Sequence, residues 1–209
     1  MQKKKPISIS YLNKKFEGFD PEPIGEHNYS AVLLPLIEKE DGLHLLFQVR
    51  ADTLKTQPGE IGYPGGKMEP GEIPVECAIR ETMEELCIPA KEINIISELN
   101  YISANSFTMY CFLGEVDENV VDLNVFNRDE VKELFTVPLE FFLKTKPYVY
   151  KYEIKPDIKE DFPYEDYGID DSYNWRKSIS TVPLYTYDDK VIWGLTARLT
   201  QDLVRLIKE

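Results

Sequence analysis

The stretch RETMEE, residues 80–85, places three glutamates and one arginine in six consecutive positions, directly after a loop rich in glycine and proline. An exposed helix face usually intersperses lysines at helical spacing, because neighbouring like charges repel. Within this stretch Arg80 is the only cation. The chain must therefore fold so that something other than adjacent side chains relieves the repulsion.

The residues around this stretch predict a helix from about Pro74 to Leu86. Proline is favoured in a first helical turn, and Pro89 blocks continuation of the helix. At about 100° per residue, one stripe of the helix is apolar enough to be buried against a core. That stripe comprises Val75, Ala78, Ile79, Thr82 and Leu86.

Glu81, Glu84 and Glu85 fall together on the far side of this predicted helix. Carboxylates that share a patch repel one another unless some of them take up protons. A hard divalent cation relieves the repulsion, since Mg²⁺ takes oxygen ligands, keeps several waters and shares its remaining positions with substrate phosphates. We interpret the glutamates as a metal site; a surface helix with stray acids is the alternative.

The loop ahead of the helix supports the metal interpretation. Gly65 and Gly66 have no side chains, so the backbone there can approach a metal ion or a phosphate closely. Glu72 lies just before the helix, within reach of Arg80 or of a metal-bound water.

The remaining sequence predicts a mixture of strands and helices. Residues 29–37 and 43–50 read as a hairpin around Asp41-Gly42, with further strands within 93–102 and 107–116. Residues 128–143 predict helical turns around an extended TVPL, and residues 195–209 predict a closing amphipathic helix.

Residues 144–190 hold eight of the thirteen tyrosines. We predict an irregular, tyrosine-rich excursion packed on the core, and whether it also covers a ligand is left open.

Composition narrows the class of protein. A chain of 209 residues with 43% hydrophobic content predicts a single domain, residues 1–209. No apolar run reaches the about 18 residues of a membrane span, and no apolar segment follows the N-terminal lysines, so we expect no membrane partner and a cytoplasmic location. The net charge of −13 disfavours a nucleic-acid surface, so an anionic ligand needs cations placed locally. Three cysteines and two histidines favour reduced thiols over disulfides or zinc.

The spacing of Gly66, Glu72 and RETMEEL, residues 80–86, resembles the Nudix box, the signature of enzymes that hydrolyse nucleoside diphosphates linked to another moiety. The resemblance implies an α/β fold, a Nudix α/β/α sandwich with a mixed sheet and a loop-helix-loop catalytic motif, and a requirement for Mg²⁺ or Mn²⁺. It also implies site residues. The metal ligands would be Glu81, Glu84 and Glu85, assisted by the Gly65 carbonyl. The catalytic set would be Glu81, Glu84, Arg80 and Glu72, in which Arg80 and Glu72 brace the loop.

Two positions depart from the box. Cys87 stands where the box has a glycine after the helix, and Thr82 stands where it has an aliphatic residue. A non-glycine residue in a left-handed helix cap costs on the order of 1 kcal/mol, which alters the turn and leaves the carboxylates in place. We therefore expect an active enzyme.

A metal-activated water would attack one phosphorus in line, and a carboxylate must accept the proton of that water. Glu81 is one candidate for this general base. In the superfamily that the box indicates, the base is sometimes an acid from a later loop, for which Glu130 and Glu133 are candidates here.

The segment LFQVRADTLKTQPGEIGYPGG, residues 46–66, is similar to the extra signature of coenzyme A pyrophosphatases within the Nudix superfamily, with Lys55 in place of an arginine and Tyr63 in place of a phenylalanine. YNWR at 173–176 and VIWGLTARL at 191–199 also resemble that subfamily. The resemblance implies that Arg50, Lys55 and Gly66 bind the substrate, with the two cations near its 3′-phosphate.

The function we expect is hydrolysis of coenzyme A or its derivatives to 3′,5′-ADP and 4′-phosphopantetheine. One alternative is a Nudix pyrophosphatase for ADP-ribose or related dinucleotides, because the metal box is indifferent to what the diphosphate joins. Another is a non-catalytic Nudix-fold module that binds a nucleotide. In each case the partner is a small-molecule nucleotide. The choice between Mg²⁺ and Mn²⁺, between free, acyl and disulfide forms of coenzyme A, and between monomer and homodimer stays open.

Overall fold

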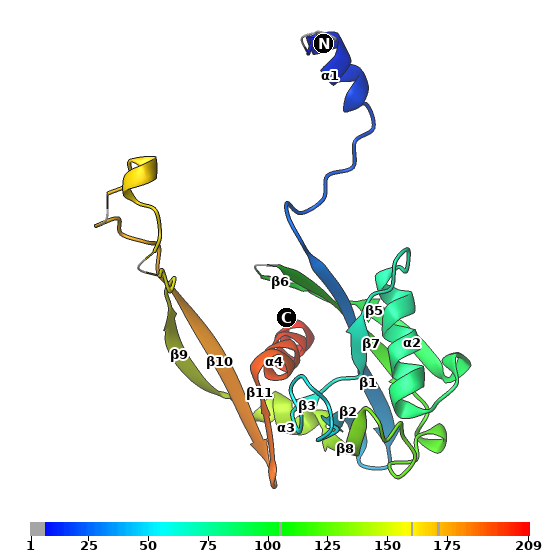
Figure 1. Cartoon of the computed structure of the whole chain (residues 1–209). Helices are drawn as coiled ribbons and strands as arrows, with labels where there is room; N and C mark the ends of the chain where they lie inside the picture. Colours follow the sequence, from blue (N-terminus) through cyan, green and yellow to red (C-terminus); the bar gives the residue numbers. More distant parts are fainter. Residues whose placement is uncertain (1–6, 105, 160, 171) are drawn as a thin grey trace.

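A mixed eight-stranded sheet forms the centre of the computed structural model, which describes residues 7–104, 106–159, 161–170 and 172–209 (Figure 1). Its strands are β1 (Asn28–Lys39), β2 (Gly42–Arg50), β3 (Ile61–Gly62), β4 (Gly65–Lys67), β5 (Ile93–Glu98), β6 (Ile102–Ala104), β7 (Phe107–Val116) and β8 (Val131–Pro138). The main path is β3-β2-β1-β7-β5, and β4, β6 and β8 pair with β1, β7 and β2. Strands β1 and β7 run parallel, whereas their other neighbours are antiparallel.

Helices cover both faces of this sheet, which confirms the expected α/β/α sandwich. Along β1, Ala31 and Leu33 belong to the apolar cluster under α2 (Pro74–Leu86). The alternate residues Val32 and Leu34 belong to a second cluster with α3 (Leu139–Lys144) and α4 (Gly194–Lys208). Since both faces of β1 are buried, its sequence is a continuous apolar run instead of an alternating one.

The predicted hairpin is confirmed as β1 and β2, and the predicted first helix is confirmed as α2, with the predicted bounds. Short 3-10 helices lie at Ala90–Glu92 (η1) and Glu118–Val120 (η2). The N-terminal α1 (Ile9–Lys15) has no buried residues and lies away from the sheet (Figure 1).

The prediction of helical turns before TVPL was wrong, because residues 131–138 form strand β8. The buried residues Val131, Leu134 and Val137 are three apart, a spacing that also suits one face of a helix. Pairing with β2, in which Phe135 lies opposite Phe47, decides the structure instead. Helical structure begins only at Leu139.

The irregular excursion predicted for residues 144–190 is instead framed by regular strands. β9 (Tyr148–Ile154), β10 (Ser178–Tyr187) and β11 (Lys190–Trp193) form a second antiparallel sheet, and the stretch between β9 and β10 includes the short helix η3 (Glu165–Tyr167). We call the β9–β10 ribbon the arm. It projects from the body of the molecule, and every residue of β9 is exposed (Figure 1). The end of β10 does pack on the core, because Tyr185 is 2% exposed and belongs to the same cluster as Phe142.

In the described part of the chain, no helix is both long enough and apolar enough to pass through a membrane.

Helix α2 ends at Leu86, and the residue that caps it, Cys87, has a left-handed backbone with φ 54° and ψ 37°. An L side chain in this region brings its Cβ close to the following carbonyl oxygen, which glycine avoids. The thiol is exposed, so little packing depends on it.

We therefore predict that Cys87→Gly raises the free energy of unfolding by up to about 1 kcal/mol, because glycine removes the Cβ strain at this cap. Cys87→Ala is the matched control, since it deletes the thiol and keeps the Cβ. Urea denaturation of the three proteins measures the effect. A glycine variant no more stable than the alanine variant would contradict the prediction.

Candidate active site

The glycine loop lies directly on helix α2. Gly65 and Gly66, in β4, pair with Val32 and Ala31 of β1. Gly65 has φ 152°, and a Cβ there would collide with the backbone of β1, while a Cβ on Gly66 would collide with the Glu81 carboxylate. The loop can therefore approach the acidic face of α2 only because both residues are glycine.

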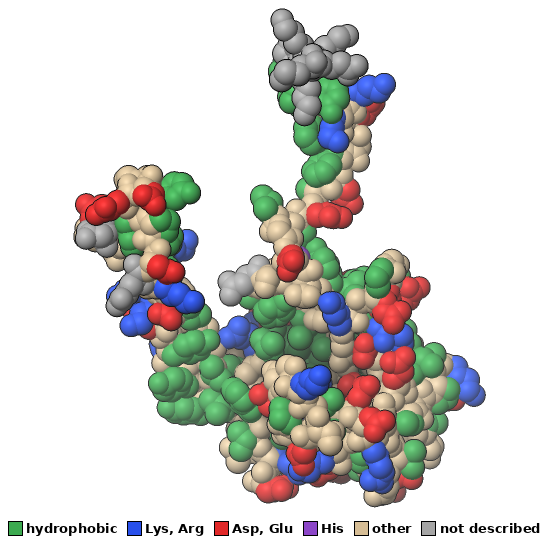
Figure 2. All heavy atoms as spheres, in the orientation of Figure 1, with side chains coloured by type: hydrophobic (Ala, Val, Ile, Leu, Met, Phe, Trp, Pro, Cys, Tyr) green, Lys and Arg blue, Asp and Glu red, His purple; other side chains and the backbone are tan. Residues whose placement is uncertain are grey.

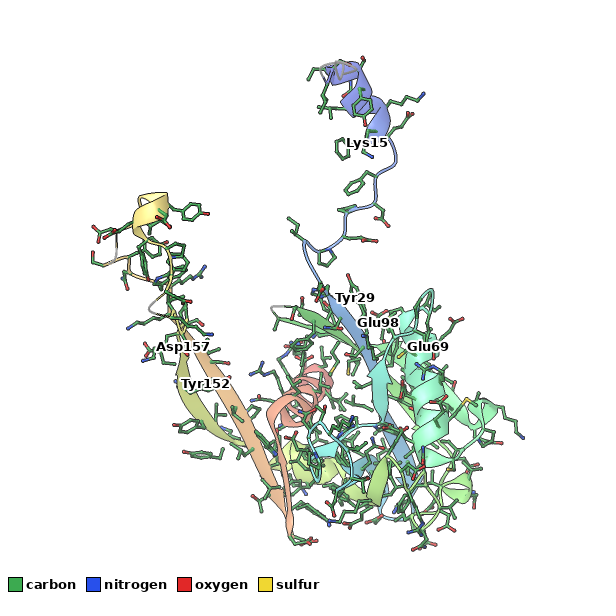
Figure 3. The ribbon with its side chains drawn as sticks, viewed as in Figure 1. Lys15, Tyr29, Glu69, Glu98, Tyr152 and Asp157 are labelled. Atoms are coloured by element: carbon green, nitrogen blue, oxygen red, sulfur yellow. The ribbon has the colours of Figure 1, made fainter. Side chains whose placement is uncertain are left out.

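Arg80 connects the loop to the helix. Its Nε and Nη2 donate to the two carboxylate oxygens of Glu72 at 2.8 and 3.0 Å, and Nη2 also donates to the Lys67 carbonyl at 3.3 Å. This fork, with the Glu69 N–H, lowers the pKa of Glu72 to about 2. Glu69 marks the turn between the loop and the helix in Figure 3. Arg80 thus links Glu72 and Lys67 of the loop to helix α2, and the catalytic roles implied for Arg80 and Glu72 stay predictions.

Three carboxylates come together beside this brace. Glu81 and Glu85 from α2 and Glu130 from the turn before β8 each offer an oxygen, and these atoms lie within 4.8 Å of one another. We call these residues the acid cluster. In Figure 2, acidic side chains gather along α2 on the face in view.

The acid cluster is partly removed from water. Glu85 is only 2% exposed, and burial raises its pKa to about 7, although the Gln48 amide and the Gly65 N–H oppose that rise. The Gly65 N–H donates to Glu85 Oε2 at 2.9 Å. Burial also raises the pKa of Glu81, against the opposing effect of Arg80, whose Nη1 donates to Glu81 Oε1 at 2.8 Å.

Backbone hydrogen bonds place Glu130 in the acid cluster. The Asn127 N–H donates to the Glu85 carbonyl at 3.0 Å, and the Glu130 N–H donates to the Asn127 carbonyl at 3.1 Å. The Glu130 carbonyl in turn accepts from the Ala51 N–H at 2.9 Å, just after β2. The turn is thus tied to the end of α2 and to the end of β2.

The other predicted acids lie apart from the acid cluster. The Glu133 carboxylate pairs with Lys190 Nζ at 2.8 Å, so of the two later acids proposed as a base only Glu130 reaches the site. The Glu84 side chain is 54% exposed and lies 3.4 Å from Arg80 Nη1. Glu84 is therefore placed at the edge of the site, where the brace and solvent meet.

The acid cluster fits a divalent cation. It offers oxygen ligands, which Mg²⁺ and Mn²⁺ prefer, and it sits under a loop with no side chains at positions 65 and 66. The backbone N–H of Gly65 connects this loop to the acid cluster by its hydrogen bond to Glu85.

Gln48 is a neighbour of the site that the sequence analysis missed. Its side chain is buried in β2 near Glu85, and its Oε1 has no hydrogen-bond partner in the described part of the chain. The available signal was a single polar residue inside the apolar run LLFQV.

A cavity of about 550 Å³ opens beside Gly65. Arg50, at the end of β2, lines this cavity, and its role in substrate binding stays a prediction. Lys55, in contrast, is exposed on the loop after β2 and is absent from the cavity wall.

The buried Glu85 predicts how the stability of the metal-free protein depends on pH. Its pKa rises from 4.5 to about 7 on folding, so between these values the folded state holds the proton more tightly than the unfolded state. Raising the pH through this window should therefore lower the free energy of unfolding, by up to about 3 kcal/mol.

Denaturation of chelator-treated protein at pH 5, 6, 7 and 8 measures this slope, and Glu85→Gln should flatten it. The same pH dependence in the wild type and in Glu85→Gln would contradict the assignment.

Comparison with known proteins places the chain in a family. The family described as NUDIX domain matches residues 26–157. The chain is 37% identical over 126 residues to "Peroxisomal coenzyme A diphosphatase NUDT7" of Mus musculus, covering 59% of this chain and 52%, about half, of that relative. It is 31% identical over 180 residues to "Uncharacterized Nudix hydrolase NudL" of Yersinia pestis (strain Pestoides F), covering 85% of this chain and 79% of that relative.

A solved structure, a MutT/nudix family protein from Enterococcus faecalis, shares the fold. It has a TM-score of 0.54 and 12% sequence identity, and the match covers 97% of this chain and 71% of that one. The acid cluster, the glycine loop and the Arg80 brace all lie inside the matched residues 26–157. The chain belongs to the NUDIX domain family.

Proposed function

We propose that this Nudix hydrolase cleaves the diphosphate bond of coenzyme A or its derivatives, giving 3′,5′-ADP and 4′-phosphopantetheine. The observation that carries the proposal is the position of Arg50, on the wall of a cavity that begins at Gly65, beside the acid cluster. Coenzyme A carries a 3′-phosphate in addition to its diphosphate. Because the chain has a net charge of −13, binding of that phosphate needs a cation placed beside it. The name of the mouse relative supports the same substrate class.

In this proposal the protein's own groups orient the reaction. When bound, Mg²⁺ or Mn²⁺ supplies neutralisation of the diphosphate oxygens and a water of lowered pKa. Glu81, Glu85 and Glu130 would supply the oxygens that hold the ion, and Glu84, the other acid that the Nudix box implies as a ligand, lies at the exposed edge of the site. Arg80 orients Glu81 through its 2.8 Å hydrogen bond.

The proton of the attacking water needs an acceptor inside the site. Glu130 is the later acid whose carboxylate lies with Glu81 and Glu85, whereas Lys190 engages Glu133. We therefore place the general base at the carboxylate oxygen of Glu130 that would not hold the ion, with Glu81 as the alternative.

Other expectations from the sequence stay predictions. We propose that residues 1–209 form one domain, because α4 lies beyond residue 157 and still contributes Ala197 and Leu203 to the core. A cytoplasmic location and a homodimer also stay predictions; the mouse relative is named peroxisomal.

A hydrolysis screen tests the proposed function. The protein is incubated with Mg²⁺ or Mn²⁺ and with coenzyme A, ADP-ribose, NADH or diadenosine tetraphosphate, and the products are identified by mass. We expect coenzyme A to have the highest kcat/KM and to yield 3′,5′-ADP and 4′-phosphopantetheine. A preference for ADP-ribose would replace this substrate by the alternative, and binding without turnover of any substrate would indicate a nucleotide-binding module.

Glu85→Gln controls for contaminating hydrolases in the same screen. It keeps the size of the side chain and removes its charge from the acid cluster, so turnover should fall by at least about a hundredfold at saturating Mg²⁺. Circular dichroism checks that the variant is folded.

A further inference from the structure

The motif VIWGLTARL, residues 191–199, has no part in the acid cluster. It forms most of β11 and the first turns of α4. Trp193, Thr196 and Arg198 from this motif line the cavity beside Gly65. The motif therefore faces the same space as the proposed substrate, on the side away from the glutamates of α2.

The cavity lies between the body and the arm. Gly65 is at its boundary with the acid cluster, and Tyr152 and Ile154 of β9 contribute the wall on the arm. Figure 3 labels Tyr152 on this strand, and Figure 2 shows hydrophobic side chains on both the arm and the body where the two approach. Ile102 and Met109 add further apolar surface from the main sheet. A ligand here would meet both apolar or aromatic groups and polar ones.

Two arginines stand out on this wall. Arg50 Nε is buried and has no hydrogen-bond partner in the described part of the chain, and its Nη2 reaches the Thr56 carbonyl only at 3.5 Å. Arg198 Nη2 donates to the Thr181 carbonyl of β10. Among the described residues, neither guanidinium forms an ion pair. Glu60, the acidic residue on the same wall, therefore pairs with neither arginine.

Both guanidinium groups are half-buried and stay without an ion pair among the described residues, although the chain has 37 acidic against 24 basic residues. A buried donor without a partner destabilises the protein unless a ligand or water completes its hydrogen bonds. The planar fork of arginine suits the oxygens of a phosphate. The two arginines therefore fit an anionic group of the ligand.

We propose that Arg198 and Arg50 together bind a phosphate monoester that the substrate carries beyond its scissile diphosphate. Arg198 thus takes the place that the sequence analysis gave to Lys55, which lies outside the cavity. The inference rests on the proposed function, in which the 3′-phosphate of a coenzyme A-type nucleotide is this group. Arg198 is then a specificity-determining residue.

A purely structural role for Arg198 has a different signature. Its hydrogen bond to Thr181 joins α4 to the arm, so loss of the side chain could displace the arm and weaken every ligand equally. Loss of a phosphate contact instead weakens only ligands that carry the extra phosphate. Two probes that differ by that phosphate separate the two roles.

Calorimetric titration with adenosine 3′,5′-bisphosphate and with AMP tests the inference, because neither probe has a diphosphate to hydrolyse. The wild type should bind the bisphosphate about ten- to a hundredfold more tightly than AMP, the range of a charge-assisted contact. Arg198→Gln and Arg50→Gln should each remove most of this ratio while changing the affinity for AMP by less than about threefold. Lys151→Gln is the matched control: it removes one charge from the exposed strand β9, outside the cavity, and should keep the wild-type ratio.

Equal losses for both probes in Arg198→Gln, or a wild type without preference for the bisphosphate, would overturn the inference. The hydrolysis screen separates this failure from failure of the proposed function. Turnover of coenzyme A without a bisphosphate preference would contradict only the proposed role of the two arginines. A bisphosphate preference that depends on Arg198, in a protein that does not hydrolyse coenzyme A, would contradict only the proposed reaction.

Discussion

The Glu81 carboxylate lies where a side chain at residue 66 would be, and the backbone of β1 lies where a side chain at residue 65 would be. These two contacts let strand β4 fit between β1 and helix α2. Because β1 is also the strand that pairs with β2 and β7, the contacts fix the loop, the helix and the sheet relative to one another. The carboxylates of α2 thereby take positions that are set by backbone packing, and the rest of the site is built around them.

The same packing leaves negative charge without compensation. Arg80 is engaged by Glu72 and Glu81, and among the described residues no cation forms an ion pair with Glu85 or Glu130. Burial of such carboxylates is unfavourable, which is why the pKa of Glu85 rises. A bound cation would remove this cost, which supports the metal site proposed for the acid cluster. Arg50 and Arg198 line the cavity wall instead and form no ion pair among the described residues, which is why we propose them as contacts for the substrate.

Local patterns in the sequence accounted for the centre of the site. Helix α2 was predictable because its apolar stripe and its prolines are signals that lie within a few helical turns of one another. The left-handed backbone at Cys87 was predictable because the Nudix box has a glycine at that position. Strand β8 was not predictable, since burial of every third residue in 131–137 imitates a helix and only pairing with distant β2 decides it. Glu130, and not Glu133, lies in the acid cluster because backbone hydrogen bonds to Glu85 and Ala51 hold the turn before β8. The position of Arg198 depends on its hydrogen bond to the arm. Neither set of hydrogen bonds can be predicted from neighbouring residues in the sequence.

Titration of the apo protein with Mn²⁺, followed by the electron paramagnetic resonance signal of the free ion, tests the acid cluster most directly. Glu130→Gln should weaken Mn²⁺ binding by at least about tenfold, a change that even residues behind the ligands of a metal can cause. Glu133→Gln also removes one negative charge, three residues later, but it breaks only the ion pair with Lys190. It should therefore bind Mn²⁺ with the affinity of the wild type. Equal affinities in all three proteins would show that Glu130 does not belong to a metal site and would contradict the account.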